Sequence, residues 1–351
     1  MKFNVGYQMS DEFVSYIIRQ KEHIGEVYFA FGYFPNGRGS TNEKGLSPWE
    51  AQSKQEAHLG AFSENGIPLD LLLNGTCYGK DSQSRTFFEK IGDTVDYLSE
   101  KYGLSVVTTT SPLIAKFIKN NFPLLKVRAS VNMEIGTVDG MRYVSELFDS
   151  FYIKREYNRN ASVIKELTKW GRENGKEILL LANSGCLNNC SAHIFHDNLV
   201  SHEDEIAGMD NAYQFTGICR DYLKDKDNLL RYLAQTNFVR PEDIKLYEPY
   251  FSSVKLATRV NRVPSRVLRA YIEGRYIGSV MDLLEPDHNG VISPYIVENS
   301  KISADFTSNV LFCDKKCENC TYCRDVLKGA LVSLENSFYI GNSSESEGKQ
   351  C

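Results

Sequence analysis

Residues 69–109 read LDLLLNGTCYGKDSQSRTFFEKIGDTVDYLSEKYGLSVVTT and contain one full repeat of a pattern that runs along the chain. The stretch begins with a short apolar run at 69–73 and ends with a run rich in β-branched residues at 105–109. Between them, residues 85–102 have apolar side chains at helical spacing and follow a serine, a common helix cap. Strand, helix and strand in this order form the unit from which parallel α/β sheets are built.

The same alternation extends on both sides of this stretch. Eight segments have the length and composition of strands, namely residues 3–7, 27–31, 69–73, 105–109, 127–131, 150–154, 178–182 and 253–257. Helical spacing is found between and after them, at residues 47–64, 85–102, 111–121, 140–148, 161–174 and 264–274. Eight strands with intervening helices predict an α/β protein with a (β/α)8 barrel of the TIM type over residues 1–282. An open doubly wound sheet is disfavoured because no early glycine-rich phosphate loop is present.

Two regions exceed what a simple barrel requires. Residues 183–252 separate the seventh predicted strand from the eighth, whereas barrel loops usually have about 2–6 residues. This long insertion contains three cysteines and is therefore expected to be functional. Residues 283–340 are predicted to form a cysteine-rich C-terminal extension that closes over the barrel, and the small polar residues 341–351 a disordered tail.

The composition suits a globular protein in a reducing environment. The 351 residues are 42% hydrophobic and 24% charged, and the formal net charge of -5 gives no overall basic field for a nucleic acid. Neither a signal peptide nor an apolar run of membrane-spanning length is recognisable, so we expect a cytoplasmic protein, in which thiols stay reduced. The nine cysteines therefore favour metal binding over disulfides.

The segment at 183–203, NSGCLNNCSAHIFHDNLVSHE, carries the strongest chemical signal. Cys186 and Cys190 are separated by three residues, and three histidines follow them. Thiolate ligands select zinc or iron–sulfur clusters. We predict a 4Fe-4S cluster at the barrel mouth, held by a group that includes these two cysteines; a tetrahedral zinc site of two cysteines and two histidines is the alternative.

A second group of cysteines comes late in the chain, with the spacing C-x3-C-x2-C-x2-C. It consists of Cys313, Cys317, Cys320 and Cys323. Its first three match the loop of radical S-adenosylmethionine enzymes, but that loop follows the first barrel strand and this group follows the last. The group is predicted to bind zinc, to bind a second cluster, or to lend one cysteine such as Cys317 to the mid-chain site. Cys77 is either a small buried hydrophobic residue or a further ligand.

Candidate catalytic residues follow the sixth predicted strand, because barrel enzymes place their catalytic groups at the strand ends. Arg155 can clamp a carboxylate or phosphate, and Glu156 and Tyr157 could relay protons. His196, within the cysteine segment, is a candidate for acid–base work. The structural alternative is that Arg155 and Glu156 simply pair at the barrel rim.

The chain resembles the collagenase-like proteins of peptidase family U32 in three segments, ASVN at 129–132, YIKREYNRN at 152–160 and LLLANSGCLNNCSAHIFHDNLVSHE at 179–203. The resemblance continues through NFVRPEDIKLY, VKLATR and RAYIEGRY. It implies a 4Fe-4S cluster in a barrel-like domain, since several members look like oxygen-independent hydroxylation factors in ubiquinone synthesis and RNA modification. It also implies cluster ligands among Cys186, Cys190, Cys219 and one further cysteine.

The sequence departs from the family pattern at two places, so its substrate is expected to differ from those of better-known members. Relatives tend to have Pro-Phe-Arg where Ser191, Ala192 and His193 stand, and a glycine where Thr258 stands.

The leading hypothesis is an iron–sulfur enzyme that hydroxylates, or otherwise modifies by redox chemistry, a small-molecule, RNA or peptide substrate. The alternatives are a peptidase, with zinc in place of iron, and a non-catalytic electron-transfer subunit with a protein partner in a heteromeric complex. No Ser-His-Asp set or HExxH motif supports the peptidase.

Overall fold

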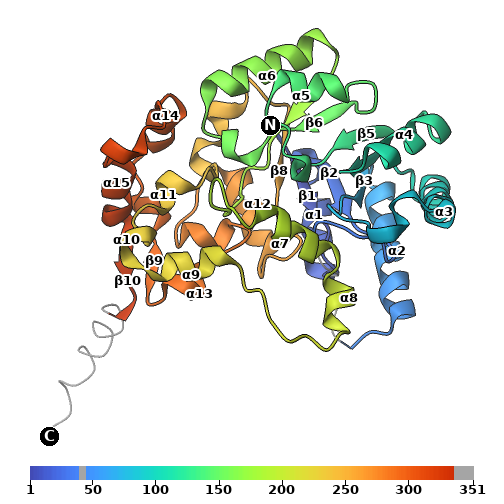
Figure 1. Cartoon of the computed structure of the whole chain (residues 1–351), viewed down its shortest axis with the longest axis horizontal. Helices are drawn as coiled ribbons and strands as arrows, with labels where there is room; N and C mark the ends of the chain where they lie inside the picture. Colours follow the sequence, from blue (N-terminus) through green and yellow to red (C-terminus); the bar gives the residue numbers. More distant parts are fainter. Residues whose placement is uncertain (39–44, 336–351) are drawn as a thin grey trace, which may run out of the picture.

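The computed structural model describes residues 1–38 and 45–335. Eight parallel strands form a single sheet in which β1 to β7 pair consecutively and β1 also pairs with β8 (Figure 1). The strands are β1 Lys2–Gly6, β2 Ile24–Phe29, β3 Leu69–Leu73, β4 Val106–Thr109, β5 Lys126–Ala129, β6 Ser150–Tyr152, β7 Glu177–Leu179 and β8 Ser253–Leu256.

The residues that directly follow β7 bring the last two strands together. The backbone N–H of Lys255 donates to the Leu180 carbonyl at 2.9 Å, and the N–H of Ala182 donates to the Lys255 carbonyl at 2.9 Å. Leu181 and Lys255 accordingly form a parallel bridge. The strands thus form a nearly closed barrel, and the predicted (β/α)8 fold is confirmed.

Helices surround the barrel, and most begin after a side chain that accepts a hydrogen bond from the first turn. They are α1 Asp11–Arg19, α2 Pro48–Glu64, α3 Arg85–Tyr102, α4 Pro112–Asn121, α5 Val138–Tyr143, α6 Ala161–Glu173 and α12 Pro264–Glu273. Short 3-10 helices connect elements at Lys21–His23, Gly79–Gln83, Val131–Met133, Arg155–Tyr157, Pro241–Tyr247, Val280–Leu283, Asn299–Lys301 and Cys317–Asn319. No helix within the described residues is both long and apolar enough to cross a membrane.

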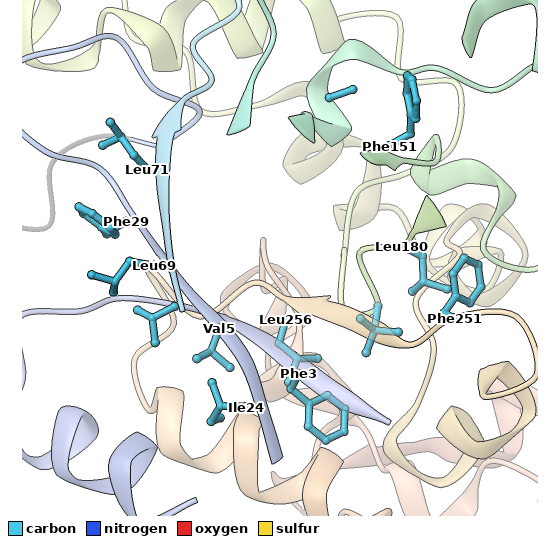
Figure 2. Close-up of a cluster of buried hydrophobic side chains, with 14 of the residues drawn as sticks. Phe3, Val5, Ile24, Phe29, Leu69, Leu71, Phe151, Leu180, Phe251 and Leu256 are labelled. Carbon is cyan, nitrogen blue, oxygen red and sulfur yellow. The ribbon is translucent and has the colours of Figure 1, made fainter. Parts of the chain in front are cut away.

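The main hydrophobic core lies between the outer face of the barrel and its helices. Apolar side chains at alternate strand positions, such as Phe3 and Val5, face outward and pack against side chains such as Ile17 of α1. Figure 2 shows Phe3 and Val5 of β1 beside Leu256 of β8. Burial of these side chains supplies the dominant stabilising term.

The interior of the barrel is charged, whereas branched aliphatic residues usually fill this space. Glu26, Asp70, Arg128 and Lys255 are all buried there. The Arg128 guanidinium of β5 forms an ion pair with Glu26 of β2 and lies 3.4 Å from Asp70 of β3. These strands are not all neighbours, so the contacts cross the barrel interior.

A second core lies beside the barrel and joins the long insertion to the C-terminal extension. The insertion contains α7 His193–Ser201, α8 Glu203–Ala207, α9 Ile218–Lys224, α10 Lys226–Leu229 and α11 Tyr232–Gln235. The extension contains α13 Asn289–Ile292, β9 Tyr295–Val297, α14 Phe306–Leu311, α15 Tyr322–Ala330 and β10 Leu331–Ser333. Leu233 of the insertion and Leu327 of the extension both belong to this core, and Figure 1 shows α9–α11 beside β10 and α15.

The predicted elements agree with the observed ones except near their ends. Helix α5 ends at Tyr143, earlier than predicted, where Val144 and the residues after it form turns. A β-branched residue has a low helix propensity, which is consistent with this early end. The predicted domain boundary at 282/283 stays a prediction, and the predicted tail at 341–351 lies outside the described residues.

Candidate functional site

Two adjoining pockets open where the strands end and their loops begin. The barrel pocket has a volume of about 60 Å³ and is lined by residues that include Asn74, Asn132, Lys255, Arg259 and Glu285. The thiol pocket has a volume of about 70 Å³ and is lined by residues that include Glu134, Glu156, Cys186, Cys190, His193, His196, Cys219 and Pro286. Arg38, Arg155 and Asp197 line both pockets. The structure therefore brings three predicted cysteines together with Arg155, Glu156 and His196.

Close backbone packing fixes the start of the cysteine segment. Gly185 donates its N–H to the Glu285 carbonyl at 3.1 Å, and Glu285 donates to the Asn183 carbonyl at 3.0 Å. A Cβ atom at Gly185 would lie 2.2 Å from the Pro286 carbonyl oxygen. Only glycine permits this approach, so the extension holds the residue directly before Cys186.

The loop between the two cysteines is held by Glu156. Asn189 has a left-handed backbone with φ 55°, and its N–H donates to Glu156 Oε1 at 2.6 Å. The other carboxylate oxygen of Glu156 lies 3.0 Å from Lys154 Nζ. Glu156 thus contacts the backbone of the loop, and its predicted part in proton relay stays a prediction.

Arg155 links Cys186 to a group of charged residues. Its Nη1 donates to Cys186 Sγ at 3.7 Å, its Nη2 lies 2.7 Å from His193 Nε2, and the same Nη2 lies 3.7 Å from Asp197 Oδ2. The Cys186 sulfur thus accepts a hydrogen bond from a charged side chain that lines the same pocket.

His193 bridges two carboxylates that sequence reasoning missed. Its Nδ1 lies 2.9 Å from Glu134 Oε1, and its Nε2 lies 2.9 Å from Asp197 Oδ2. Hydrogen bonds to Asp197 first and Glu134 second raise the pKa of His193 to about 9, while burial and the facing Arg155 act against this rise. The two carboxylates thus favour the cationic form of His193, against the facing Arg155 guanidinium.

The raised pKa of His193 predicts how the free energy of unfolding depends on pH. Its folded pKa of about 9 exceeds its ordinary value of 6.5, so its stabilising contribution is complete below about pH 6.5 and is lost as pH rises through about 9. Unfolding by urea across this range should therefore show that His193→Gln costs most at low pH and least at high pH. The exposed His23→Gln is the control, and a pH-independent cost for His193→Gln would contradict the assignment.

The remaining residues predicted for the site differ in their surroundings. Burial, followed by the neighbouring Cys186 and Cys190 thiols, raises the pKa of Cys219. Burial, followed by the charge of Arg38, lowers the pKa of His196, so this ring is neutral at pH 7. Tyr157 packs against Gly136, where a Cβ would lie 2.4 Å from its ring, and it lines neither pocket.

No family model matches this chain, and no curated protein sequence matches it. Among solved structures, the U32 peptidase Mk0906 matches with a TM-score of 0.52 and 16% sequence identity, over 73% of this chain and 91% of that chain. The chain has a U32-like fold. Phosphoribosyl anthranilate isomerase from Thermus thermophilus also matches, with a TM-score of 0.37 and 12% identity, over 78% of this chain and 98% of that chain.

The late cysteines lie together on the extension of this U32-like fold, and none of them lines the thiol pocket. Cys313, Cys317 and Cys320 are exposed, and Cys323 is half-buried. Burial raises the pKa of Cys323 to about 11, and the charges of Cys317 and Cys313 add to this rise against the opposing Arg159. Within residues 1–38 and 45–335, no three His, Cys, Asp or Glu side chains converge as the ligands of a metal ion would.

The barrel pocket of the U32-like fold contains charged residues that were not predicted. Arg38 Nε lies 2.8 Å from Glu285 Oε1, and burial lowers the pKa of Lys255 to about 8. The sequence offered one signal for Lys255, which is a charged residue inside the predicted strand at 253–257. Arg38 and Glu285 had none, because they come from loops far apart in the sequence.

Proposed function

We propose that this chain is an iron–sulfur enzyme that modifies its substrate by redox chemistry, with hydroxylation independent of molecular oxygen as the reaction. The observation that carries the proposal is that Cys186, Cys190 and Cys219 line one pocket directly beside the barrel pocket. Substrate held at the barrel mouth is thus adjacent to the thiols. This is where barrel enzymes carry out their chemistry.

The thiols of this pocket have the chemistry that a 4Fe-4S cluster needs, and binding would have to draw together side chains that do not converge within the described residues. Cysteine thiolates are the usual ligands of such clusters, and Cys186, Cys190 and Cys219 would hold it. The guanidinium of Arg155 donates to Cys186 Sγ at 3.7 Å and would offset the negative charge of the cluster ligands. When bound, the cluster supplies one-electron transfer. A fourth cysteine would complete the ligand set; three alone would leave one iron open to substrate.

The charges around the barrel pocket favour a substrate with a carboxylate or phosphate group. Arg38, Arg155, Lys255 and Arg259 supply positive charge, and Glu285 already pairs with Arg38. Arg155 Nε has no hydrogen-bond partner among the residues that the structure describes. A buried donor of this kind is costly unless a ligand satisfies it, and arginine binds carboxylates and phosphates bidentately.

Metal analysis of anaerobically prepared protein tests the proposal. The wild type is expected to be brown, to absorb at about 400 nm and to contain about four irons with matching sulfide. Cys186→Ala is expected to lose most of this iron because it removes a ligand that lines the pocket. The matched Cys317→Ala variant is expected to keep the cluster of the thiol pocket, since Cys317 does not line it.

The other outcomes separate the alternatives. Colourless protein that contains zinc would overturn the iron–sulfur proposal and favour the zinc peptidase. About eight irons in the wild type, with about half of them lost in Cys317→Ala, would indicate a second cluster in the late group. A complete loss would make Cys317 the fourth ligand. A full cluster with no substrate modified by the chain alone would favour the electron-transfer subunit.

A further inference from the structure

Lys255 of β8 is buried in the barrel interior, and it lines the barrel pocket. Only 6% of this residue is exposed. Its backbone is fixed on both sides, because its N–H donates to the Leu180 carbonyl and its carbonyl accepts from the Ala182 N–H, each at 2.9 Å. A rigid strand thus holds a buried lysine in the wall of the pocket where we place the substrate.

Two aromatic rings lie against the Lys255 amine. Its Nζ lies 3.9 Å from the ring centroid of Tyr28 on β2 and 5.2 Å from that of Tyr152 on β6. The hydroxyls of these tyrosines bond elsewhere, since Tyr28 donates to the Leu256 carbonyl at 2.8 Å and Tyr152 accepts from Asn4 Nδ2 at 3.2 Å. In the part of the chain that the structure describes, Lys255 Nζ makes no hydrogen bond and no ion pair. Ring faces alone contact the amine, which leaves its nitrogen free to bond to a ligand.

The carboxylates of the barrel interior contact a different cation. Arg128 forms an ion pair with Glu26 and lies 3.4 Å from Asp70 Oδ2. The same Asp70 oxygen accepts a hydrogen bond from the Thr108 hydroxyl at 2.7 Å. Among the described residues, neither carboxylate forms an ion pair with Lys255. A role as their direct counter-ion therefore does not account for this lysine.

The surroundings of Lys255 favour its neutral amine, which is the nucleophilic form. Burial lowers the pKa of Lys255 to about 8; the charges of Asp70 and Glu26 oppose this shift, and those of Arg128 and Arg259 add to it. An ordinary lysine has a pKa of about 10.4, so nearly all of its amine is protonated at neutral pH. Lys255 therefore offers more free amine than a lysine at the surface.

We propose that the Lys255 amine forms an imine with an aldehyde or ketone that carries a carboxylate and binds in the barrel pocket. Desolvated lysines are the amines that form such imines in enzymes. Arg38, Arg155 and Arg259 line the same pocket and supply cations for the carboxylate, which arginine can bind bidentately. With a volume of about 60 Å³, the pocket admits a small carbonyl compound or one end of a larger one. The inference rests on the substrate site proposed above but not on the cluster.

The imine forms with the release of one water. The nitrogen lone pair of Lys255 bonds to the carbonyl carbon, and a proton moves from this nitrogen to the carbonyl oxygen. The carbon–oxygen bond then breaks as the oxygen takes up a second proton, from solvent, and leaves as water. Nothing is oxidised or reduced, and attack of water on the imine carbon reverses the reaction. The protonated imine draws electrons from the neighbouring carbon, which makes the bound substrate more reactive.

Reductive trapping on the full-length, anaerobically prepared protein tests the proposal. Glyoxylate, a small aldehyde that carries a carboxylate, is added with sodium cyanoborohydride, which reduces an imine to a stable amine. Mass spectrometry of peptides then locates the carboxymethylated lysines. Lys255 should react at least about 10-fold faster than Lys169, because more of its amine is neutral. Lys169 is the internal control, since 73% of its side chain is exposed. A rate at Lys255 no higher than that at Lys169 would overturn the proposal without any variant being made.

Acetaldehyde tests the part of the proposal that concerns the carboxylate, because it has a methyl group in its place. The preference for Lys255 over Lys169 should fall by about 10-fold or more with acetaldehyde, the scale expected when charge-assisted hydrogen bonds to arginine are lost. An equal preference for the two aldehydes would overturn the selection of a carboxylate by this pocket.

Variants separate the imine from the fold and from the cluster. Lys255→Arg keeps the positive charge but forms no imine, so the fast incorporation of glyoxylate should be lost, whereas the control Lys169→Arg should keep it. Fast incorporation that persists in Lys255→Arg would contradict the assignment. Cys186→Ala, which is expected to lose iron, should still be labelled at Lys255 at the wild-type rate. Labelling without iron would uphold this proposal and not the cluster, and iron without labelling would do the reverse.

Discussion

Replacing Arg128 with methionine is expected to lower the free energy of unfolding by about 3–5 kcal/mol. The guanidinium pairs with Glu26, lies 3.4 Å from Asp70 and donates to Ser150 Oγ at 3.0 Å, all inside the barrel. Methionine fills a similar volume but removes the guanidinium that contacts two buried carboxylates, and leaves Lys255 as the remaining positive charge near them. Urea unfolding of the two proteins at neutral pH measures the difference.

An exposed ion pair provides the control for this prediction. Arg142 forms a salt bridge with Asp139 at 2.9 Å, and both side chains are more than 60% exposed. Arg142→Met should change the free energy of unfolding by less than about 1 kcal/mol, as surface pairs do. Equal effects of Arg128→Met and Arg142→Met would show that the charged interior does not stabilise the barrel.

The second large effect is expected for Arg159→Met, again a loss of about 3–5 kcal/mol, because buried acceptors would be left without donors. Arg159 is fully buried, and its guanidinium donates four hydrogen bonds to backbone carbonyls of the insertion. Two go to Phe238, at 2.9 and 2.6 Å, one to Leu233 at 2.9 Å and one to Thr236 at 2.8 Å. Methionine satisfies none of them.

Thermal and urea unfolding measure this loss of stability, and limited proteolysis shows in which part of the chain it occurs. Cleavage within the insertion should become faster in Arg159→Met, since Arg159 fixes the segment that ends at Phe238. The matched control is Arg172→Met, on the exposed face of the same helix α6. A variant of Arg159 as stable and as protease-resistant as the Arg172 control would contradict the role of these hydrogen bonds.

The barrel could be predicted from sequence because its elements have strong local signals. Strand β3 and helix α3 were predicted with their observed bounds, Leu69–Leu73 and Arg85–Tyr102. The helices of the insertion could not be predicted in this way. Helices such as α10 and α11 have four residues each, too few for a periodic pattern, and they are stabilised by packing against the extension.

The candidate site was predictable where its residues share a motif. Cys186 and Cys190 are recognisable by their short spacing, and Arg155 stands in a charged run directly after a strand. Glu134 and Asp197 were missed, because an isolated carboxylate gives no signal until the fold brings it beside His193. Strand ends from distant parts of the sequence meet at the barrel mouth, so only the three-dimensional structure reveals these partners.

The core shared by the insertion and the extension has a consequence for the order of assembly during synthesis. Pro286 lines the thiol pocket, and Leu327 packs in the same core as Leu233. A ribosome-bound chain that has not yet released these late residues holds its mid-chain thiols in an unfinished, solvent-exposed site. If the proposed cluster is bound here, we therefore expect its insertion to follow completion of this shared core, even though Cys186, Cys190 and Cys219 are synthesised well before Leu327.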